Sequence, residues 1–450
     1  ASTFGAAAQS SFFYPSASAA WQFTTLGALS NNSVLNFGKL RMGYGVVGIQ
    51  PPVYASSTLY TSSSLVSGWG PTLNAGDYGQ GSYTPSNRLG NINLRPERKT
   101  EFEIGTDLRF FQDRTSLSFT YYQNRTTDAI FAVDVPISTG FYDKLDNAAT
   151  IENKGYELDI NTLVYKQGDF SFDLGLNWFR NVNTVTDLNG VESIFLNGFT
   201  GSSSRAVEGH PMGALWAGSF QRDDNGNYIL NDAGFPVVAP SEGVVGDPNP
   251  EWRGGVSATA RWRGFGFNIL FETSQGNDMW FGTEGVLRYF GVSAATAHDL
   301  VTFTPEQADA TILSNGATVS GYYAPNDDGH STVRGTYEDF GGGDVFLDQS
   351  WYLANGGGFG PVGEQFVKDA SWTRIREMAL SYRLDSKGFR EATKLSSIDF
   401  SLTGRNLVIW TQAEGVDPDT NLTGASNGRG LDYFTNPGTR SFLFTIKVAY

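Results

Sequence analysis

The sequence predicts an all-β protein whose antiparallel strands form part of a transmembrane β-barrel. Three observations lead to this prediction. Apolar residues recur at every second position in several long segments, short turns join these segments at one end while long connections join them at the other, and no run of 18 apolar residues is present. An apolar residue at every second position gives a strand one apolar face. The question is whether that face meets a protein core or lipid.

The alternation is clearest at the end of the chain. In residues 441–450 the large apolar side chains at alternate positions are Phe442, Phe444, Ile446, Val448 and Tyr450. Leu443 is the only large apolar residue on the other face. The same pattern predicts strands in residues 38–47, 100–110, 154–165, 170–179 and 263–274.

The connections between these strands are of two kinds. Short turns are predicted at residues 112–114, 166–169 and 263–266. Long connections are predicted at about residues 49–98, 127–153, 181–251 and 277–370. Short turns on one side and long loops on the other are typical of outer-membrane barrels, in which the long loops are extracellular. Long structureless loops are uncommon in compact soluble domains.

A soluble antiparallel sheet with one face in water would also alternate, so this alternative has to be compared with lipid. The predicted strands contain ten or more residues, which exceeds the usual five or six and matches a tilted membrane strand. Aromatic residues lie near strand ends, and the polar faces carry charges of both signs. We therefore predict that the apolar face of residues 441–450 contacts membrane lipid.

The composition excludes some classes of protein. The net charge of −15 argues against nucleic acid as a partner, and the absence of cysteine excludes disulfides and thiolate metal sites. Aromatic residues make up 14% of the chain, which suits strands and interfacial girdles. The first residues lack the basic start and apolar core of a signal peptide, so we expect a mature chain or a fragment.

No catalytic, cofactor or metal site is predicted. The chain has three histidines, and it contains neither a G-x-S-x-G elbow nor an H-E-x-x-H motif. We expect His298 and His330 to be solvated loop residues. Asp223, Asn225 and Asn227 have the spacing of a calcium loop, but the later positions do not fit, and a hairpin turn at Asn225 and Gly226 is the preferred interpretation.

The long connections contain aromatic side chains that are candidates for substrate contact. Flat rings beside carboxylates and amides suit sugar faces, peptides or packing within the loops themselves. These candidates are Trp69, Trp280, Trp351 and Tyr352.

Several segments together resemble the SusC/RagA-like TonB-dependent transporters. Residues 12–21 (FFYPSASAAW) resemble a barrel strand with the pattern F-P-S-x-S-x-x-W. Leu94, Pro96, Glu97, Glu103 and Gly105 match the pattern L-x-P-E-x-x-x-x-x-E-x-G. Further similar segments follow in the same order, at residues 40–50, 126–165, 246–252, 371–384, 404–421 and 436–450.

The resemblance implies the C-terminal part of a barrel of about 22 strands whose plug domain is absent from this chain. It implies an integral protein of the bacterial outer membrane that takes part in TonB-dependent import of an oligosaccharide or peptide. The implied partners are a SusD-like surface lipoprotein, the TonB system acting through the plug, and the N-terminal half of the barrel. The alternative is a non-transporting structural or adhesive surface barrel, for which the upstream reading frame would encode no plug.

About half a barrel would have two unpaired strand edges, which are costly in hydrocarbon. We expect the first strand, near residues 13–23, to pair with a preceding strand. We expect the strand that ends at Tyr450 to close the ring with the first strand of the missing portion.

Overall fold

The computed structural model describes residues 12–450 except 28, 31, 66–69, 71, 75–82, 200 and 425. It divides into two compact units, which are described separately. The first unit comprises Ala1–Leu163, Gly175–Phe195 and Ala206–Met212, and the second comprises Val164–Leu174, Leu196–Arg205 and Gly213–Tyr450.

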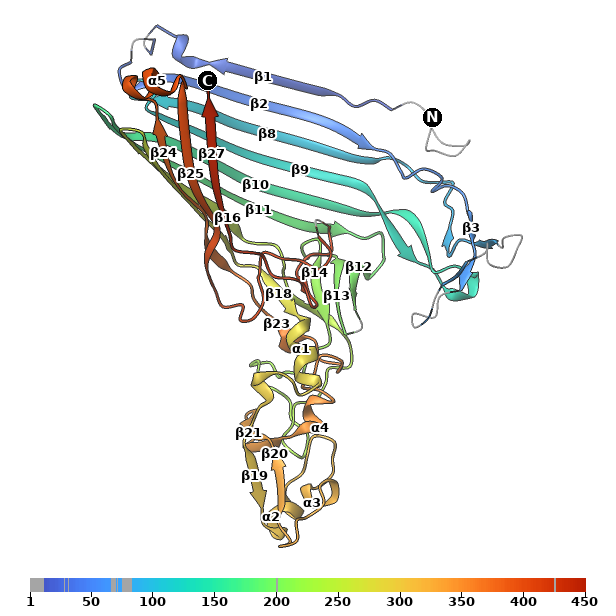
Figure 1. Cartoon of the computed structure of the whole chain (residues 1–450). Coiled ribbons are helices and arrows are strands. Elements are labelled where there is room, and N and C mark those ends of the chain that lie inside the picture. Colours follow the sequence, from blue (N-terminus) through green and yellow to red (C-terminus); the bar gives the residue numbers. More distant parts are fainter. Residues whose placement is uncertain are drawn as a thin grey trace. The chain divides into compact units, whose positions relative to one another are not determined.

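The first unit contains a run of long antiparallel strands, coloured blue to teal in Figure 1. In order of pairing they are β1 (Ser16–Gln22), β2 (Leu35–Ile49), β8 (Glu97–Phe110), β9 (Thr115–Asp134) and β10 (Asp143–Gln167). β10 and the following strand β11 (Phe170–Asp187) have residues in both units. The apolar residues of β2, β8 and β9 meet in register, since Met42 pairs with Ile104, and Ile104 pairs with Tyr121.

The second unit contains a matching run of antiparallel strands. In order of pairing they are β16 (Trp252–Trp262), β17 (Phe265–Gln275), β24 (Trp372–Leu384), β25 (Ser397–Thr411) and β27 (Ser441–Ala449). With β11, the two runs make eleven long strands among the described residues. This agrees with the number of strands expected for about half of a large barrel.

One face of the second run of strands is an exposed apolar surface. Phe267, Leu380, Leu402 and Phe444 are partners in register across β17, β24, β25 and β27. Their exposed fractions are 39%, 55%, 51% and 63%. The other predicted lipid-facing residues of β27, and Tyr450 after it, are also exposed. A contiguous exposed apolar surface is typical of a membrane or protein contact, and contact with lipid stays a prediction.

The three short turns lie where the sequence predicts them. β8 and β9 are joined by residues 111–114, β10 and β11 by Gly168 and Asp169, and β16 and β17 by Arg263 and Gly264. Arg263 and Gly264 both have positive φ, 45° and 87°, as a two-residue hairpin turn of type I′ requires.

The predicted long connection at residues 127–153 is wrong. β9 continues to Asp134 and β10 begins at Asp143, so the connection contains only residues 135–142, with η3 (Ile137–Thr139). The register of β10 against β9 shifts between Asn147 and Ile151. These irregularities break the two-residue period, which is why the sequence pattern there does not look like a strand.

The extended ends of these strands have a protein core of their own. Seven residues of the first unit form a buried cluster: Ala129, Ala148, Ala149, Val185, Leu188, Ile194 and Ala206.

The predicted connection at 181–251 is likewise too long, because β11 continues to Asp187. The rest of it contains β12 (Ser193–Phe199), β13 (Ser202–Val207), β14 (Ala214–Ala217) and β15 (Gly243–Gly246).

The connection at 49–98 has nearly the predicted bounds, since β2 ends at Ile49 and β8 begins at Glu97. It contains β3 (Tyr60–Ser62), β4 (Ser64–Leu65), β5 (Leu73–Asn74), β6 (Tyr83–Pro85) and β7 (Arg88–Leu89). Outside the long connections, η1 (Phe23–Thr25) lies between β1 and β2, and α5 (Lys387–Thr393) lies between β24 and β25.

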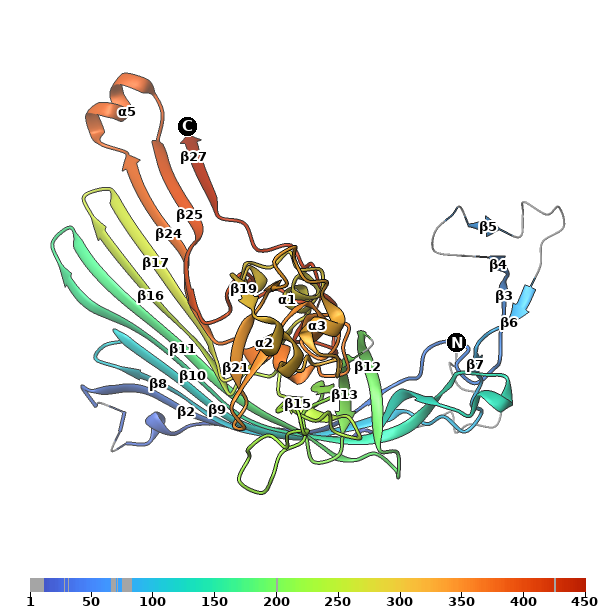
Figure 2. The same ribbon diagram turned by 90° about the horizontal axis from the view of Figure 1, so that it is seen from below.

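Residues 276–371, between β17 and β24, are called the loop body here, and they are folded rather than structureless (Figure 2). Its helices are α1 (Gly282–Tyr289), η4 (Ala294–Thr296), α2 (Pro305–Ala310), α3 (Val319–Tyr322), α4 (Gln349–Tyr352) and η5 (Glu364–Phe366). Its strands are β18 (Asp278–Phe281), β19 (Leu300–Phe303), β20 (Ser331–Arg334), β21 (Thr336–Asp339), β22 (Asp344–Leu347) and β23 (Val367–Asp369). None of the described helices is long and apolar enough to cross a membrane.

The two outer strands each have one paired edge. β1 pairs with β2, and β27 pairs with β25. No partner for their other edges is present among the described residues. Pairing of these edges with the rest of a barrel therefore stays a prediction.

A charge on the apolar face of β27 should destabilise the complete protein in a bilayer. We expect Phe444→Arg to lower the free energy of unfolding by about 2–4 kcal/mol, the cost of a cation at the bilayer midplane. The matched control is Thr445→Arg on the opposite face, which should cost much less. Urea unfolding in lipid vesicles measures both, and an equal loss in the two variants would contradict lipid contact at Phe444.

Candidate functional site

The polar face of the first unit is a network of charged and amide side chains. Arg41 of β2 reaches across its neighbours, with guanidinium distances of 2.5 Å to Glu103 on β8 and 2.5 Å to the hydroxyl of Thr120 on β9. Lys39 and Asp107 extend the network through an ion pair of 3.5 Å. The positive and negative side chains that the sequence predicts on the polar face are thus present as ion pairs. Pairing lowers the free-energy cost of placing these charges side by side on the strands.

A row of asparagines continues this polar face. The side-chain amide of Asn153 on β10 donates to Asn124 on β9 at 3.1 Å. The amides of Asn181 and Asn183 on β11 donate to the Asn153 oxygen at 3.1 and 2.8 Å, and the Tyr122 hydroxyl donates to Asn181 at 3.1 Å. Such a surface offers hydrogen-bonding groups without net charge.

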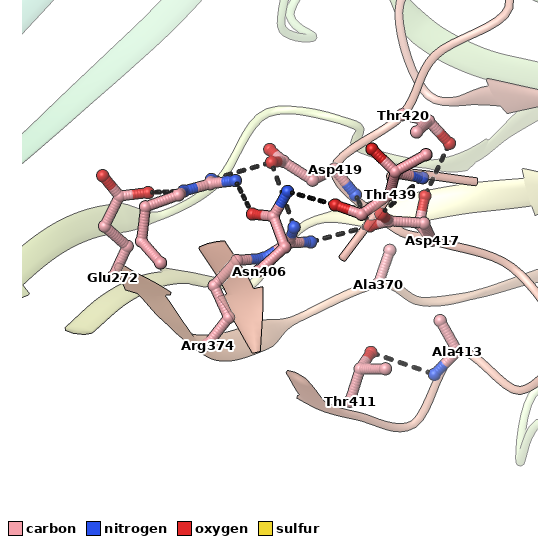
Figure 3. A network of polar contacts seen from close by, with 12 residues as sticks. Glu272, Ala370, Arg374, Asn406, Thr411, Ala413, Asp417, Asp419, Thr420 and Thr439 are labelled. Carbon is pink, nitrogen blue, oxygen red and sulfur yellow. Dashed lines mark hydrogen bonds and ion pairs between the residues drawn. The ribbon is translucent and has the colours of Figure 1, made fainter. Parts of the chain in front are cut away.

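In the second unit, two arginines of β24 form the most deeply buried ionic network, shown in Figure 3. Trp372, Arg374 and Arg376 occupy every second position of the strand. Both guanidinium groups lie over the ring of Trp372, at 4.5 Å (Arg374) and 5.5 Å (Arg376) from its centroid. Arg374 is only 3% exposed, and it pairs with Asp417 at 2.7 Å and Asp419 at 3.6 Å.

Arg376 joins this network to two neighbouring strands. It contacts Glu272 on β17 at 2.5 Å, Asn406 on β25 at 3.0 Å and Asp419 at 2.8 Å. Asn406 has a positive φ of 52°, and the β24–β25 register shifts at the same place. The side-chain amide of Asn406 donates to the carbonyl of Thr439 at 3.0 Å.

The network attaches the connection between β25 and β27, residues 412–440, to β24. This connection contains β26 (Leu431–Asp432) and the acidic segment at 415–421. Burial alone would raise the pKa of Asp417, but the hydrogen bond from Arg374 and those from backbone N–H groups hold it below its usual value. Asp417 therefore remains a carboxylate that neutralises a buried guanidinium.

The sequence did not identify this network. Its signal is the two-residue spacing of Trp372, Arg374 and Arg376 on a predicted strand, together with the same spacing of Asp417 and Asp419. The spacing alone does not pair the two segments, because Arg374 and Asp417 are 43 positions apart in the sequence.

Two of the predicted substrate contacts are buried in cores of the second unit. Trp280 is 3% exposed and packs with Leu215, Phe366 and Leu431. Trp351 is 5% exposed, with the rings of Phe220, Phe235 and Phe340 at 6.2, 5.8 and 5.6 Å. Both indoles are covered by the chain itself, which favours packing, the alternative that the sequence left open.

Tyr352 is the predicted contact that borders open space, while Trp69 lies outside the described residues. Tyr352 is half-buried and lines a cavity in the loop body. Its hydroxyl lies 2.8 Å from Nε2 of His298, which is a half-buried loop residue and thus also has a protein partner. His330 lies 3.5 Å from Asp328 in the same body.

The segment with calcium-loop spacing is a hairpin turn, as the preferred interpretation predicts. The carboxylate of Asp223 accepts hydrogen bonds from the backbone N–H groups of Asn225 and Asn227, each at 2.9 Å. Arg222 and Tyr228 form an antiparallel bridge around this turn. No cluster of three or more acidic or histidine side chains positioned to hold a metal ion occurs in the part of the chain that the structure describes.

The long two-faced strands, apolar on one face and charged on the other, are those expected of a membrane β-barrel. Residues 1–407 match the family model described as TonB dependent receptor-like, beta-barrel. The chain belongs to this family, which confirms the resemblance that the motifs predict.

Curated relatives match nearly the whole chain. The TonB-dependent receptors P3 and P26 of Formosa agariphila are 23% and 25% identical to it, and each alignment covers 97% of this chain and 42% of the relative. The TonB-dependent receptor SusC of Bacteroides thetaiotaomicron is 24% identical over 70% of this chain and 32% of that protein. The chain thus spans about two fifths of the length of the first two relatives.

Solved structures share the fold. The structure titled as the RagAB peptide transporter superposes with a TM-score of 0.67 at 19% identity, covering 97% of this chain and 43% of that one. The RagAB peptide importer in its closed-closed state gives a TM-score of 0.69 at 19% identity, covering 100% of this chain and 44% of that one.

Removing the buried guanidinium of Arg374 should leave the Asp417 carboxylate without its cationic partner, while Asp419 keeps its ion pair with Arg376. We expect Arg374→Met to lower the free energy of unfolding by about 3 kcal/mol, the typical cost of breaking a buried ion pair. The matched control on the same strand is Arg383→Met, whose pairs with Asp385 and Asp399 are exposed and worth less than about 1 kcal/mol. Urea unfolding of the complete protein in vesicles measures the difference, and similar losses would contradict the assignment.

Asp417 should make the attachment of residues 412–440 sensitive to acid. Because its folded pKa lies below its usual value of 3.8, its contribution is present above that value and is lost as the pH falls through the folded pKa. We expect the melting temperature of the wild type to be higher than that of Asp417→Asn at neutral pH. This difference in melting temperature should disappear below pH 3.8. Melting temperatures across this range test this, and a gap independent of pH would refute it.

Proposed function

We propose that the complete polypeptide containing this chain imports a bulky nutrient, an oligosaccharide or a peptide, across the outer membrane with energy delivered by TonB. The observation that carries the proposal is the family match over residues 1–407. The folded loop body adds support, because large structured loops on a barrel are typical of binding at its mouth.

The proposed partners follow from the same observation. They are the N-terminal half of the barrel, which would pair with the free edges of β1 and β27, and a plug through which TonB acts. A SusD-like surface lipoprotein would cover the long loops. The names of the relatives support this set, since one is SusC and the solved structures are titled as a RagAB peptide transporter and importer.

The long connections at 49–98, 181–251 and 277–370 are proposed to be extracellular. The short turns at residues 111–114, 168–169 and 263–264 would then face the periplasm. This orientation places the loop body where it meets a nutrient before the barrel does.

Uptake should depend on TonB. In cells that express the complete polypeptide, we expect internalisation of a labelled nutrient to fall to background when the TonB-contacting segment is deleted, while surface binding remains. The measurement uses parallel sets of labelled oligosaccharides and peptides, and the set that is internalised identifies the nutrient class. Uptake unchanged by the deletion would contradict the proposal, and a reading frame without a plug would favour a structural or adhesive barrel.

A further inference from the structure

The loop body contains a cavity of 230 Å³ between segments that are distant in the sequence. It is lined by side chains from the end of α1, the segment with η4, the end of β20 and α4, including Arg288, Tyr289, His298, Arg334, Asp348 and Tyr352. It is large enough for one sugar ring or one terminal amino-acid residue.

The walls of the cavity are held by contacts within the loop body. The rings of Tyr352 and His298 are stacked with centroids 5.9 Å apart, in addition to their hydrogen bond. Burial raises the pKa of Tyr352, so its hydroxyl stays protonated at neutral pH. A protonated hydroxyl at the wall is available to a polar ligand as well as to His298.

The acidic group of the lining is already satisfied. The two carboxylate oxygens of Asp348 accept hydrogen bonds from the hydroxyls of Ser350 and Tyr323, each at 2.6 Å. Asp348 is 1% exposed, so these bonds are made away from water. Its remaining capacity to bind a cation in the cavity is therefore small.

The two arginines have capacity left. Arg334 is exposed and donates to the carbonyl of His298, and it forms no ion pair with a carboxylate in the described part of the chain. Arg288 pairs with Glu284 at 2.5 Å and lies over the ring of Phe366, but its Nε is buried without a hydrogen-bond partner. Among the described residues, Arg334 thus has no carboxylate within ion-pair distance, and Arg288 has one unsatisfied donor.

An aromatic cluster lies at the rim. The rings of Tyr289, Phe290 and Phe359 contact one another with centroids 5.0 to 6.1 Å apart, and Phe290 and Phe359 are exposed. Exposed rings beside an arginine suit a ligand that has an apolar or ring-shaped body and an anionic group.

We propose that this cavity binds a carboxylate of the imported nutrient, with Arg334 as the charged partner. The proposal rests on the import function proposed above and adds the ligand chemistry. A guanidinium that forms no ion pair can donate two parallel hydrogen bonds to a planar carboxylate. The buried Asp348 carboxylate would repel a dianionic phosphate more strongly than a singly charged carboxylate. The carboxylate can come from an acidic sugar or from the C-terminus of a peptide.

The test is calorimetric titration of the detergent-solubilised complete polypeptide with matched ligands. One arm compares oligogalacturonate with its methyl ester, and the other compares a peptide with a free C-terminus with its amide. In one arm we expect the acid to bind about tenfold more tightly than its neutral form, as expected for a charge-assisted hydrogen bond. The arm with this preference identifies the source of the carboxylate.

Variants assign the preference to the cavity. Arg334→Gln should abolish the preference for the acid, Arg334→Lys should retain part of it, and the control Arg390→Gln, in α5, should retain all of it. Unchanged binding of the neutral ligand reports that each variant is folded. A preference that survives in Arg334→Gln, or no preference in either arm, overturns the proposal. Uptake that is independent of TonB would refute the import function and leave the binding result standing.

Discussion

The structure depends on one constraint, which is that every peptide group of a strand in hydrocarbon needs a hydrogen-bond partner on a neighbouring strand. Long antiparallel strands in continuous register meet it, as β2 does against β8 over residues 37–49. The constraint also explains the two-residue turn at Arg263 and Gly264, which joins β16 and β17 without leaving peptide groups unpaired. For this reason we predict that the outer edges of β1 and β27 pair with another part of a barrel.

Backbone hydrogen bonds hold the strands together, so the side chains on the two faces of the sheet can differ in polarity. The apolar face of the second run is exposed from Phe267 to Phe444, and such a surface is stable in lipid rather than in water. The opposite face carries charges of both signs, many of them in ion pairs. Arg41 and Arg374 show two versions of this, the first on an accessible strand face and the second almost fully buried.

The long connections are folded because they contain enough apolar side chains to bury. The loop body surrounds Phe303, Val333 and Phe346, and a second cluster surrounds Trp351. The same packing that covers Trp280 and Trp351 leaves Tyr352 beside a cavity. An aromatic residue in a loop can therefore contact a ligand only if the fold leaves its ring accessible.

The sequence by itself determined the strand pattern, the apolar face of residues 441–450 and the short turns, because a two-residue period and turn residues are local properties. It misplaced the 127–153 connection, since the shifted register near Asn147 hides the period. Only the tertiary structure brought Arg374 into contact with Asp417 and His298 into contact with Tyr352. These contacts join segments far apart in the chain, and their formation depends on how the strands and the loop body fold, which local patterns do not encode.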